Sequence, residues 1–345
     1  MLLVGGMVGA AEILGNREII FPEIAAIATG ALLTPGLSWR TDSLHTFAAI
    51  TVCAALGLGI VLWMPGAVWL QMSIAYLLAS AVFLCSRTSF APMLSAAVLP
   101  VLLQTRSPVY LAAACSLTAL ILLVRRILVK CGIKDAAPFT PLPRPDRQSL
   151  LQALLRWGIV SIVIFLALKL GLRFAAAPPL LVAFTEFWKP DAVSRKRPAA
   201  FIALITICAV CGAGLRLTLC ETLGLPVCIA AALTMLSVFG VMHWIGLMLP
   251  PAAAIAVLAF LIPAEQLFVF PLQILCGIAA LVAASFLYHQ EGIPSFQKNP
   301  HPPNNSTAPR SFRTGERYFC DVSFILWSEH ALRVQCQRHR PRRRH

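Results

Sequence analysis

The chain alternates long apolar segments with short ones, and the short ones begin at or next to proline. Uncharged apolar runs of spanning length, some extended by flanking Arg or Lys stems, lie at 44–64, 67–86, 108–124, 157–168, 199–215, 226–248 and 266–288. Shorter runs lie at 22–33, 92–104, 179–188 and 251–263. A helix needs about 17 to 25 residues to cross the bilayer core, so the short runs would form half-helices of about 15 to 20 Å. The pattern predicts an all-α, polytopic membrane protein that combines long helices with paired short, proline-opened ones.

The proline landmarks recur in the same order in the two halves of the chain. Pro22 and Pro92 open the first two short runs, 70 positions apart, and Pro179 and Pro251 open the corresponding runs, 72 positions apart. The matching order and spacing predict an internal duplication. We therefore divide the chain into a first membrane unit, a basic linker, a second membrane unit and a basic tail, at 1–129, 130–151, 152–288 and 289–345.

The composition agrees with a membrane protein. Hydrophobic residues make up 59% of the 345 residues and charged residues 12%, against about 45 to 50% and about 25% in soluble domains. The mean hydropathy is +0.80. These values exclude an ordinary soluble domain, and the lipid bilayer is the first partner that the sequence implies.

The distribution of Lys and Arg predicts the topology. Basic residues are concentrated in the linker, in the turn Arg195-Lys196-Arg197 and in the tail, and such clusters belong on the cytoplasmic side. All of these basic clusters lie on the cytoplasmic side if the short segments also cross the membrane. Each unit then crosses about six times, and the chain about twelve times in total. An even number makes the two units parallel. We expect a multi-pass protein of the inner (plasma) membrane with both termini in the cytoplasm.

The first helix of the first unit is an exception to the long segments. Met1 to Leu14 offers barely half of a span. The segment lacks the basic n-region and the cleavage site of a signal peptide. We expect an abbreviated first helix, or a chain whose start has been assigned too late.

The N-termini of the short segments form the candidate binding site. Segments opened by Pro22 and Pro179 would descend and those opened by Pro92 and Pro251 would ascend, so their N-termini face one another near mid-membrane. Free N–H groups and positive helix dipole ends then converge in each unit, which makes an anion site built from backbone. The residues assigned to it are Pro22, Glu23, Pro92, Ser95, Pro179, Pro250, Pro251 and Ala252. Tight helix packing is the alternative role of the small residues.

Two charged residues add to this site. Glu23 follows Pro22 directly, whereas Leu180 holds the equivalent position in the second unit. A carboxyl at membrane depth indicates a proton-coupling group or a cation ligand; the alternative is an acid that stabilises its own helix N-terminus. Arg216 lies near the outer end of its segment, where it would draw an anion inward or anchor the helix at the interface.

The remaining polar residues offer no recognised chemistry. The sequence has no Walker loop, dinucleotide fingerprint, paired His-Glu metal motif or nucleophile elbow, so it predicts no catalytic residue and no cofactor, and it disfavours an enzyme. Cys208 and Cys211 share a helix face without a second ligand pair, so no metal site is predicted. The tail should be mostly disordered, and its positive charge suits anionic lipid headgroups. Nucleic acid is not an expected partner.

The succession of segments resembles the HPP family of membrane proteins, named for a His-Pro-Pro motif followed by small residues. The motifs that carry the resemblance are Arg197-Pro198 and Leu249-Pro250-Pro251-Ala252-Ala253-Ala254; it is best over 152–288 and fainter over 1–129. Members of that family have been linked to nitrite transport in plastids and cyanobacteria, which implies a small anion as solute. Leu249 stands where the motif has His, so no role of that His is implied. Fusaric-acid-resistance-like and aromatic-acid exporter units are rival families for the same layout.

The sequence thus predicts a membrane transporter or channel-like permease for a small solute, an anion in particular, bound between half-helix N-termini. A non-transporting membrane scaffold or assembly protein is the alternative, favoured by the scarcity of polar residues inside the helices. An intramembrane enzyme would need a catalytic pair that the sequence does not offer. A homo-oligomer is compatible with each of these functions.

Overall fold

Every regular element in the described part of the protein is a helix. The computed structural model describes residues 1–34, 38–135, 139–189 and 192–290, and no strand occurs in these ranges. The tail from residue 291 lies outside them, so the disorder and the lipid contact expected of it stay predictions. Seven described helices are long and apolar enough to cross a membrane. They are α3 (Ser43–Trp63), α4 (Val68–Cys85), α6 (Val109–Lys130), α7 (Arg147–Lys169), α10 (Pro198–Leu215), α11 (Val227–Ile245) and α13 (Phe270–Gln290). The prediction of an all-α, multi-pass membrane protein is confirmed.

Short helices and single turns separate the long helices. The short helices are α1 (Leu2–Ile13), α2 (Glu23–Ala28), α5 (Pro92–Leu103), α8 (Pro178–Phe187), α9 (Val193–Lys196) and α12 (Pro250–Leu258). The turns are η1 (Arg17–Ile19), η2 (Thr29–Leu33), η3 (Arg173–Ala176), η4 (Arg216–Thr222) and η5 (Ala264–Gln266), of which the π-helical η2 and η4 extend α2 and α10. Proline lies in the first turn of α5, α8, α10 and α12, where its missing N–H would have no intrahelical partner in any case.

Several helix boundaries differ from the predicted segments, and two of them have a clear local cause. The helix α7 begins at Arg147, inside the predicted linker, because the Asp146 carboxylate accepts a hydrogen bond from the Ser149 N–H at 2.8 Å and caps the helix. The helix α12 ends at Leu258 instead of continuing to residue 263, because hydrogen bonds between residues three apart tighten the chain after it. Local hydrogen bonds therefore determine both ends.

The two halves of the chain repeat the same helix contacts. The helix α3 packs against α5 in the first half, and α10 packs against α12 in the second. A Cβ added at Gly57 would overlap the Ala97 carbonyl oxygen, and one added at Gly212 would overlap that of Ala256. Contacts between the halves also recur, because α1 packs on α11 and α7 packs on α4. This is the pattern expected of a duplicated unit, whereas the rotation that relates the halves stays a prediction.

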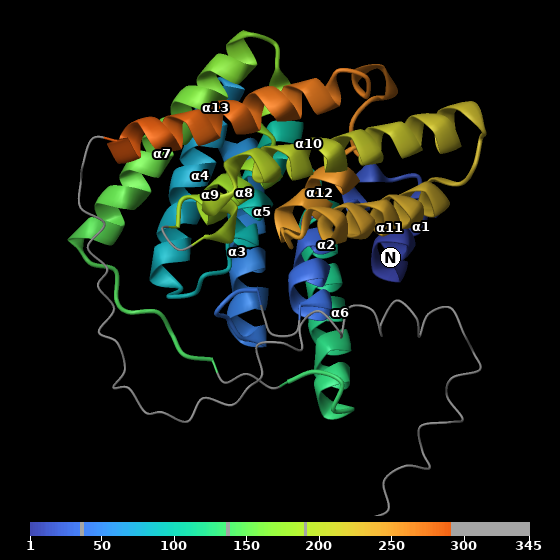
Figure 1. The fold of residues 1–345 in the computed structure, drawn as a ribbon, viewed down its shortest axis with the longest axis horizontal. Helices are drawn as coiled ribbons and strands as arrows, with labels where there is room; N and C mark the ends of the chain where they lie inside the picture. Colours follow the sequence, from blue (N-terminus) through green and yellow to red (C-terminus); the bar gives the residue numbers. More distant parts are fainter. Residues whose placement is uncertain (35–37, 136–138, 190–191, 291–345) are drawn as a thin grey trace, which may run out of the picture. The chain divides into compact units, whose positions relative to one another are not determined.

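Four short helices meet in the middle of this arrangement, where Figure 1 shows α2, α5, α8 and α12 among the long helices. The helix α2 contacts α5, α5 contacts α8, α8 contacts α12, and α12 contacts α2. They form a closed arrangement that we call the central ring. All of α12, and α5 from Pro92 to Leu102, are buried. Because lipid tails are as apolar as these side chains, close packing of small residues rather than the hydrophobic effect holds such helices together.

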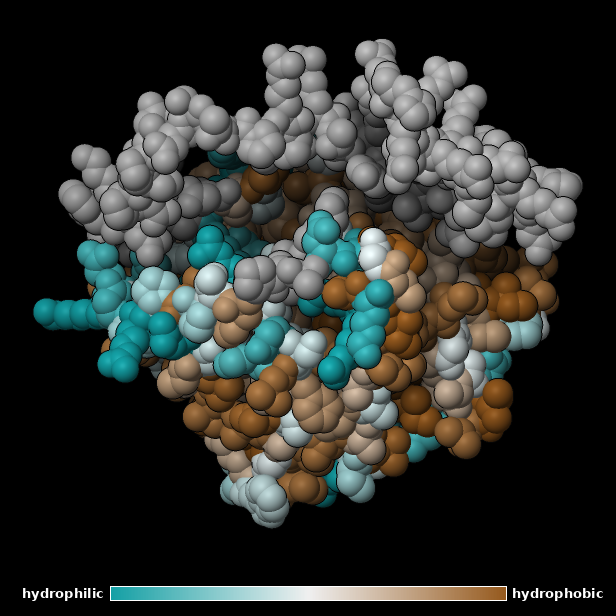
Figure 2. Space-filling view, turned by 90° about the horizontal axis from the view of Figure 1, so that it is seen from below, coloured by the Kyte–Doolittle hydropathy of each residue, from teal (hydrophilic) through white to brown (hydrophobic). Residues whose placement is uncertain are grey.

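Large apolar side chains cover the outward faces of the long helices. Leu123 on α6, Ile162 on α7 and Leu236 on α11 are each more than half exposed. Figure 2 shows hydrophobic residues over much of the visible face and hydrophilic residues gathered in a band across it. Lipid is the solvent that accommodates an apolar surface of this extent.

Hydrogen bonds between loops define one end of the helix bundle, which we call the basic end. Arg87 donates its Nε–H to the Leu142 carbonyl at 2.6 Å, and Lys134 donates from Nζ to the Thr34 carbonyl. Trp39 of the α2–α3 loop also contacts Glu186 near the end of α8. The basic residues between α2 and α3, α4 and α5, α6 and α7, and α8 and α10 are Arg40, Arg87, Lys134, Arg144, Lys189, Arg195, Lys196 and Arg197. The loops that follow α3, α5, α7 and α10 lie at the opposite end of the bundle.

Candidate functional site

Glu23 is the buried acid of the central ring. It is the first residue of α2, it is 1% exposed, and its Oε1 accepts a hydrogen bond from the Ser95 hydroxyl in the first turn of α5. Its Oε2 is buried and has no hydrogen-bond partner within the described ranges. The structure thus brings two predicted site residues together from two short helices, around a carboxyl oxygen that they leave unsatisfied.

Tyr110 is a titratable group near this carboxyl, and Cys53 lies near Tyr110. The Tyr110 hydroxyl donates to the Ala96 carbonyl at 2.8 Å, and its phenol is within electrostatic range of both Glu23 and Cys53. No cation pairs with Glu23 in the part of the chain that the structure describes. Leu180, at the equivalent position of the second half, is fully buried. The two halves of the ring therefore differ in charge, as the sequence predicted.

The other predicted site residues of the short helices lie buried at their N-termini. They are Pro22, Pro92, Pro179, Pro250, Pro251 and Ala252. Near the start of each helix, an N–H group donates to the carbonyl three residues earlier; the donors are Ile24, Leu94, Leu180 and Ala252. This pairing uses one N–H group near the start of each helix, and the anion site built from the remaining N–H groups stays a prediction.

Arg216 lies at the other end of α12. It is 5% exposed, and its Nη1 donates to the carbonyl oxygens of Ala259 and Ile262, just beyond the helix. Its Nη2 lies 3.8 Å from the Glu221 carboxylate. Carbonyl groups at a helix C-terminus lack intrahelical partners and favour a cation. These contacts give Arg216 a structural role as a cap of α12, and its role in drawing an anion inward stays a prediction.

We expect Arg216→Met to lower the stability of the folded protein. The change leaves two buried carbonyl oxygens without their donor, at a cost of about 1 to 3 kcal/mol. The thermal unfolding midpoint of the purified protein in detergent measures this loss, with Arg106→Met at an exposed arginine as the matched control. Equal midpoints for the two variants would contradict the capping role.

A cavity of about 640 Å³ lies between the two halves at the opposite end of the bundle. Its polar lining consists of Gln104, Arg173, Gln266 and Gln273. The Gln273 Oε1 accepts the Phe174 N–H at 2.8 Å, which leaves its amide NH₂ as a donor, and Arg173 donates one N–H to the Leu102 carbonyl out of five. Sequence reasoning did not assign a binding site here. Its signals were Arg173, near the outer end of its segment, and the glutamines next to α5 and α13.

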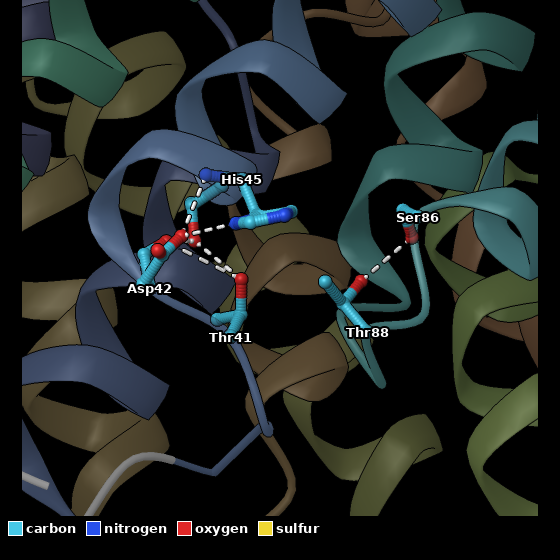
Figure 3. A network of polar contacts seen from close by, with 6 residues as sticks. Thr41, Asp42, His45, Ser86 and Thr88 are labelled. Carbon is cyan, nitrogen blue, oxygen red and sulfur yellow. Dashed lines mark hydrogen bonds and ion pairs between the residues drawn. The ribbon is translucent and has the colours of Figure 1, made fainter. Parts of the chain in front are cut away.

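A polar network lies at the basic end, where α3 begins and α4 ends (Figure 3). The Asp42 carboxylate accepts the His45 N–H at 2.7 Å and contacts the His45 Nδ1 at the same distance. Burial raises the pKa of Asp42, but the hydrogen bonds and the charge of His45 outweigh it and hold that pKa below its usual value. The Ser86 and Thr88 hydroxyls lie 2.9 Å apart, and Thr88 faces Thr41 and His45 in Figure 3. The network caps α3 and keeps this end polar.

The fold and the ring are thus those of a polytopic all-α membrane protein with one unpaired buried acid, and the described residues hold no metal-binding cluster. No family model, no curated protein and no solved structure matches the chain. The resemblance to the HPP family therefore rests on its sequence motifs alone and stays a prediction. The function has to be argued from the site itself.

Proposed function

We propose that the protein is a transporter or channel-like permease that moves a small anionic solute between the helices of the central ring. The observation that carries this proposal is the Glu23 carboxyl, buried with one oxygen unpartnered among the described residues. Leaving a buried polar atom unsatisfied costs about 1 to 3 kcal/mol, and more for a charged group. Ionisable groups at membrane depth are expensive and mark ion or proton pathways, whereas a purely structural ring would be more stable with an apolar residue there.

The lengths of the ring helices support a passage through the ring. The helices α5 and α8 have 12 and 10 residues, or about 18 and 15 Å, which is near half of the roughly 30 Å core. Short helices that begin within the bilayer are how many transporters form their binding sites. We propose that the cavity at the opposite end and the polar network at the basic end give access to the ring from the two sides.

The donors in the cavity favour an anion as the solute. The lining has the Arg173 guanidinium and the Gln273 amide, and no acidic residue. Guanidinium and amide N–H groups bind carboxylates and small oxyanions. A protonated Glu23 is neutral and would not repel such an anion. Loading one proton and one anion together would therefore leave the charge of the ring unchanged, which makes Glu23 the proposed coupling group.

The orientation follows from the positive-inside rule. We propose that the basic end faces the cytoplasm, that both termini lie there, and that the protein belongs to the inner (plasma) membrane. The resemblance to the HPP family makes nitrite the first solute to test.

Flux in proteoliposomes tests the proposal. With a proton gradient across the membrane, we expect nitrite, nitrate, acetate or phosphate to cross faster than in empty liposomes. We expect Arg173→Gln to reduce this flux about tenfold, because hydrogen bonds to charged groups contribute about 1.5 to 3 kcal/mol. The control is Arg106→Gln, which changes an exposed arginine of the first half. Folded protein that moves none of these anions would exclude an anion transporter of this kind.

A membrane scaffold is the second candidate, and one observation favours it. The complete burial of α12 and the near-complete burial of α5 are explained by close packing without any solute. A scaffold predicts no flux and predicts that Glu23→Leu stabilises the protein. Flux through the wild-type protein that is lost in Glu23→Leu would exclude the scaffold.

A further inference from the structure

A cluster of polar residues joins the two halves at the basic end; it includes the end of the ring helix α8 but not Glu23. We call it the Arg156 cluster, and its members are Trp39, Tyr76, Arg156, Thr185, Glu186 and Lys189. Trp39 precedes α3, Tyr76 is on α4, Arg156 is on α7, and the other three lie at or just after the end of α8. The Trp39 Nε1–H donates to the Glu186 Oε1 at 2.8 Å, and the Tyr76 and Thr185 hydroxyls lie 3.0 Å apart.

Arg156 brings a positive charge into this cluster without a partner. Its Nε is buried and makes no hydrogen bond within the described ranges, and neither Arg156 nor Lys189 forms an ion pair there. A guanidinium has five N–H donors and no acceptor. A buried donor left unsatisfied costs about 1 to 3 kcal/mol, and more for a charged group. A ligand with an acceptor oxygen would satisfy this N–H group.

Lys189 adds a second cation close to the first. Burial lowers the pKa of the Lys189 ammonium, the Glu186 carboxylate raises it, and the positive charge of Arg156 lowers it further. The two cations are therefore within electrostatic range and repel each other. Glu186 is the one acid in the cluster, and its Oε1 already accepts the Trp39 N–H. Two cations and one carboxylate leave an excess of one positive charge.

We propose that the Arg156 cluster binds an oxyanion of the phosphate type, held by the Arg156 guanidinium and the Lys189 ammonium. The oxyanion satisfies the buried Nε–H and removes the repulsion between the cations. The planar fork of arginine matches two oxygens of one phosphate, and lysine supplies a compact charge beside it. The same chemistry is offered by free inorganic phosphate and by the phosphate of a lipid headgroup. The site does not depend on transport through the central ring.

Calorimetric titration of inorganic phosphate into the full-length protein in a neutral detergent tests the site. We expect saturable binding that Arg156→Gln and Lys189→Gln each weaken about tenfold or more. Arg156→Lys keeps the charge but loses the fork, so its affinity should fall between those of the wild type and Arg156→Gln. The matched control is Lys196→Gln, an exposed lysine of the neighbouring α9, which should bind as the wild type does.

Thermal unfolding separates a ligand site from a structural arginine. In anion-free buffer we expect Arg156→Gln to unfold at the same temperature as the wild type or higher, because it removes an unpaired charge. Phosphate should raise the midpoint of the wild type and leave that of Arg156→Gln unchanged. A parallel series in nanodiscs compares phosphatidylglycerol with phosphatidylcholine, to measure the contribution of an anionic headgroup.

Stabilisation by phosphate in detergent assigns the site to a free anion. Stabilisation only by phosphatidylglycerol assigns it to a lipid headgroup. Either result supports the proposal when Arg156→Gln and Lys189→Gln both lose the stabilisation. No effect of phosphate or of phosphatidylglycerol on the wild type overturns it, as does an effect that persists in both variants. Asp191, which lies outside the described residues, is the acid of the chain nearest in sequence to Lys189. A loss of stability in Asp191→Asn, combined with no anion effect, would assign the cations to an internal ion pair instead.

Discussion

Replacing Glu23 by glutamine is expected to give a transporter whose flux no longer responds to pH. Glutamine matches the shape and the neutral charge of the protonated carboxyl, so at every pH the variant should transport as the wild type does at low pH. In the wild type, flux should change as the buried carboxyl gains or loses its proton, because an ionised Glu23 repels an anion in the ring. Initial rates in proteoliposomes, measured between about pH 5 and pH 8 at constant solute, check this.

The control for Glu23→Gln is Glu265→Gln, which changes an exposed acid of η5. We expect that variant to keep the pH response of the wild type. Tyr110 is within electrostatic range of both Glu23 and Cys53, so Tyr110→Phe and Cys53→Ala test whether these groups carry part of the response. If folded Glu23→Gln keeps the pH profile of the wild type, Glu23 does not couple transport to protons and only stabilises the first turn of its own helix.

Gly212→Ala is expected to be a strongly destabilising small substitution in the second half. The added Cβ overlaps the Ala256 carbonyl oxygen, and that oxygen belongs to the backbone of α12, so the two helices have to separate. Overpacking of this kind costs about 1 to 3 kcal/mol, and occasionally more. The unfolding midpoint and the yield of monodisperse protein after detergent extraction measure it.

The chain supplies its own control for this experiment. Gly214 lies on α10 two residues further along, and an added Cβ meets no atom within 4 Å. Gly214→Ala should therefore be neutral or slightly stabilising, because alanine has the higher helix propensity. Gly57→Ala, at the matching contact with Ala97 in the first half, should resemble Gly212→Ala. A stable Gly212→Ala would mean that α10 and α12 are not packed this closely.

The positions of most helices could be read from the sequence because membrane thickness and proline both act locally. The segment predicted at 44–64 is α3 at Ser43–Trp63, and the one predicted at 92–104 is α5 at Pro92–Leu103. The start of α7 was missed because a capping acid, Asp146, extends the helix well before the apolar run that begins at 157, and hydropathy does not detect such a cap.

The polar sites were harder to predict because they are formed between segments far apart in the chain. Glu23 could be singled out as an acid beside a proline, but its hydrogen bond to Ser95 joins residues 72 positions apart. In the sequence, Arg156 is only one of many basic residues near the linker. Packing of α7 against α4 buries its Nε, and Lys189, just after α8, is its cationic neighbour. Side-chain burial of this kind has no periodic signature in the sequence.

The first helix of each half packs against the other half, and this arrangement constrains biosynthesis. The helix α1 packs on α11, whose first residue is 214 positions beyond the end of α1. At about 5 to 20 residues per second, the ribosome needs about 10 to 40 seconds to make that partner. During this interval α1 must wait in the membrane or beside the insertion machinery, short of a full span and without its final neighbour. Insertion of this protein can therefore be completed only after most of the chain has been made.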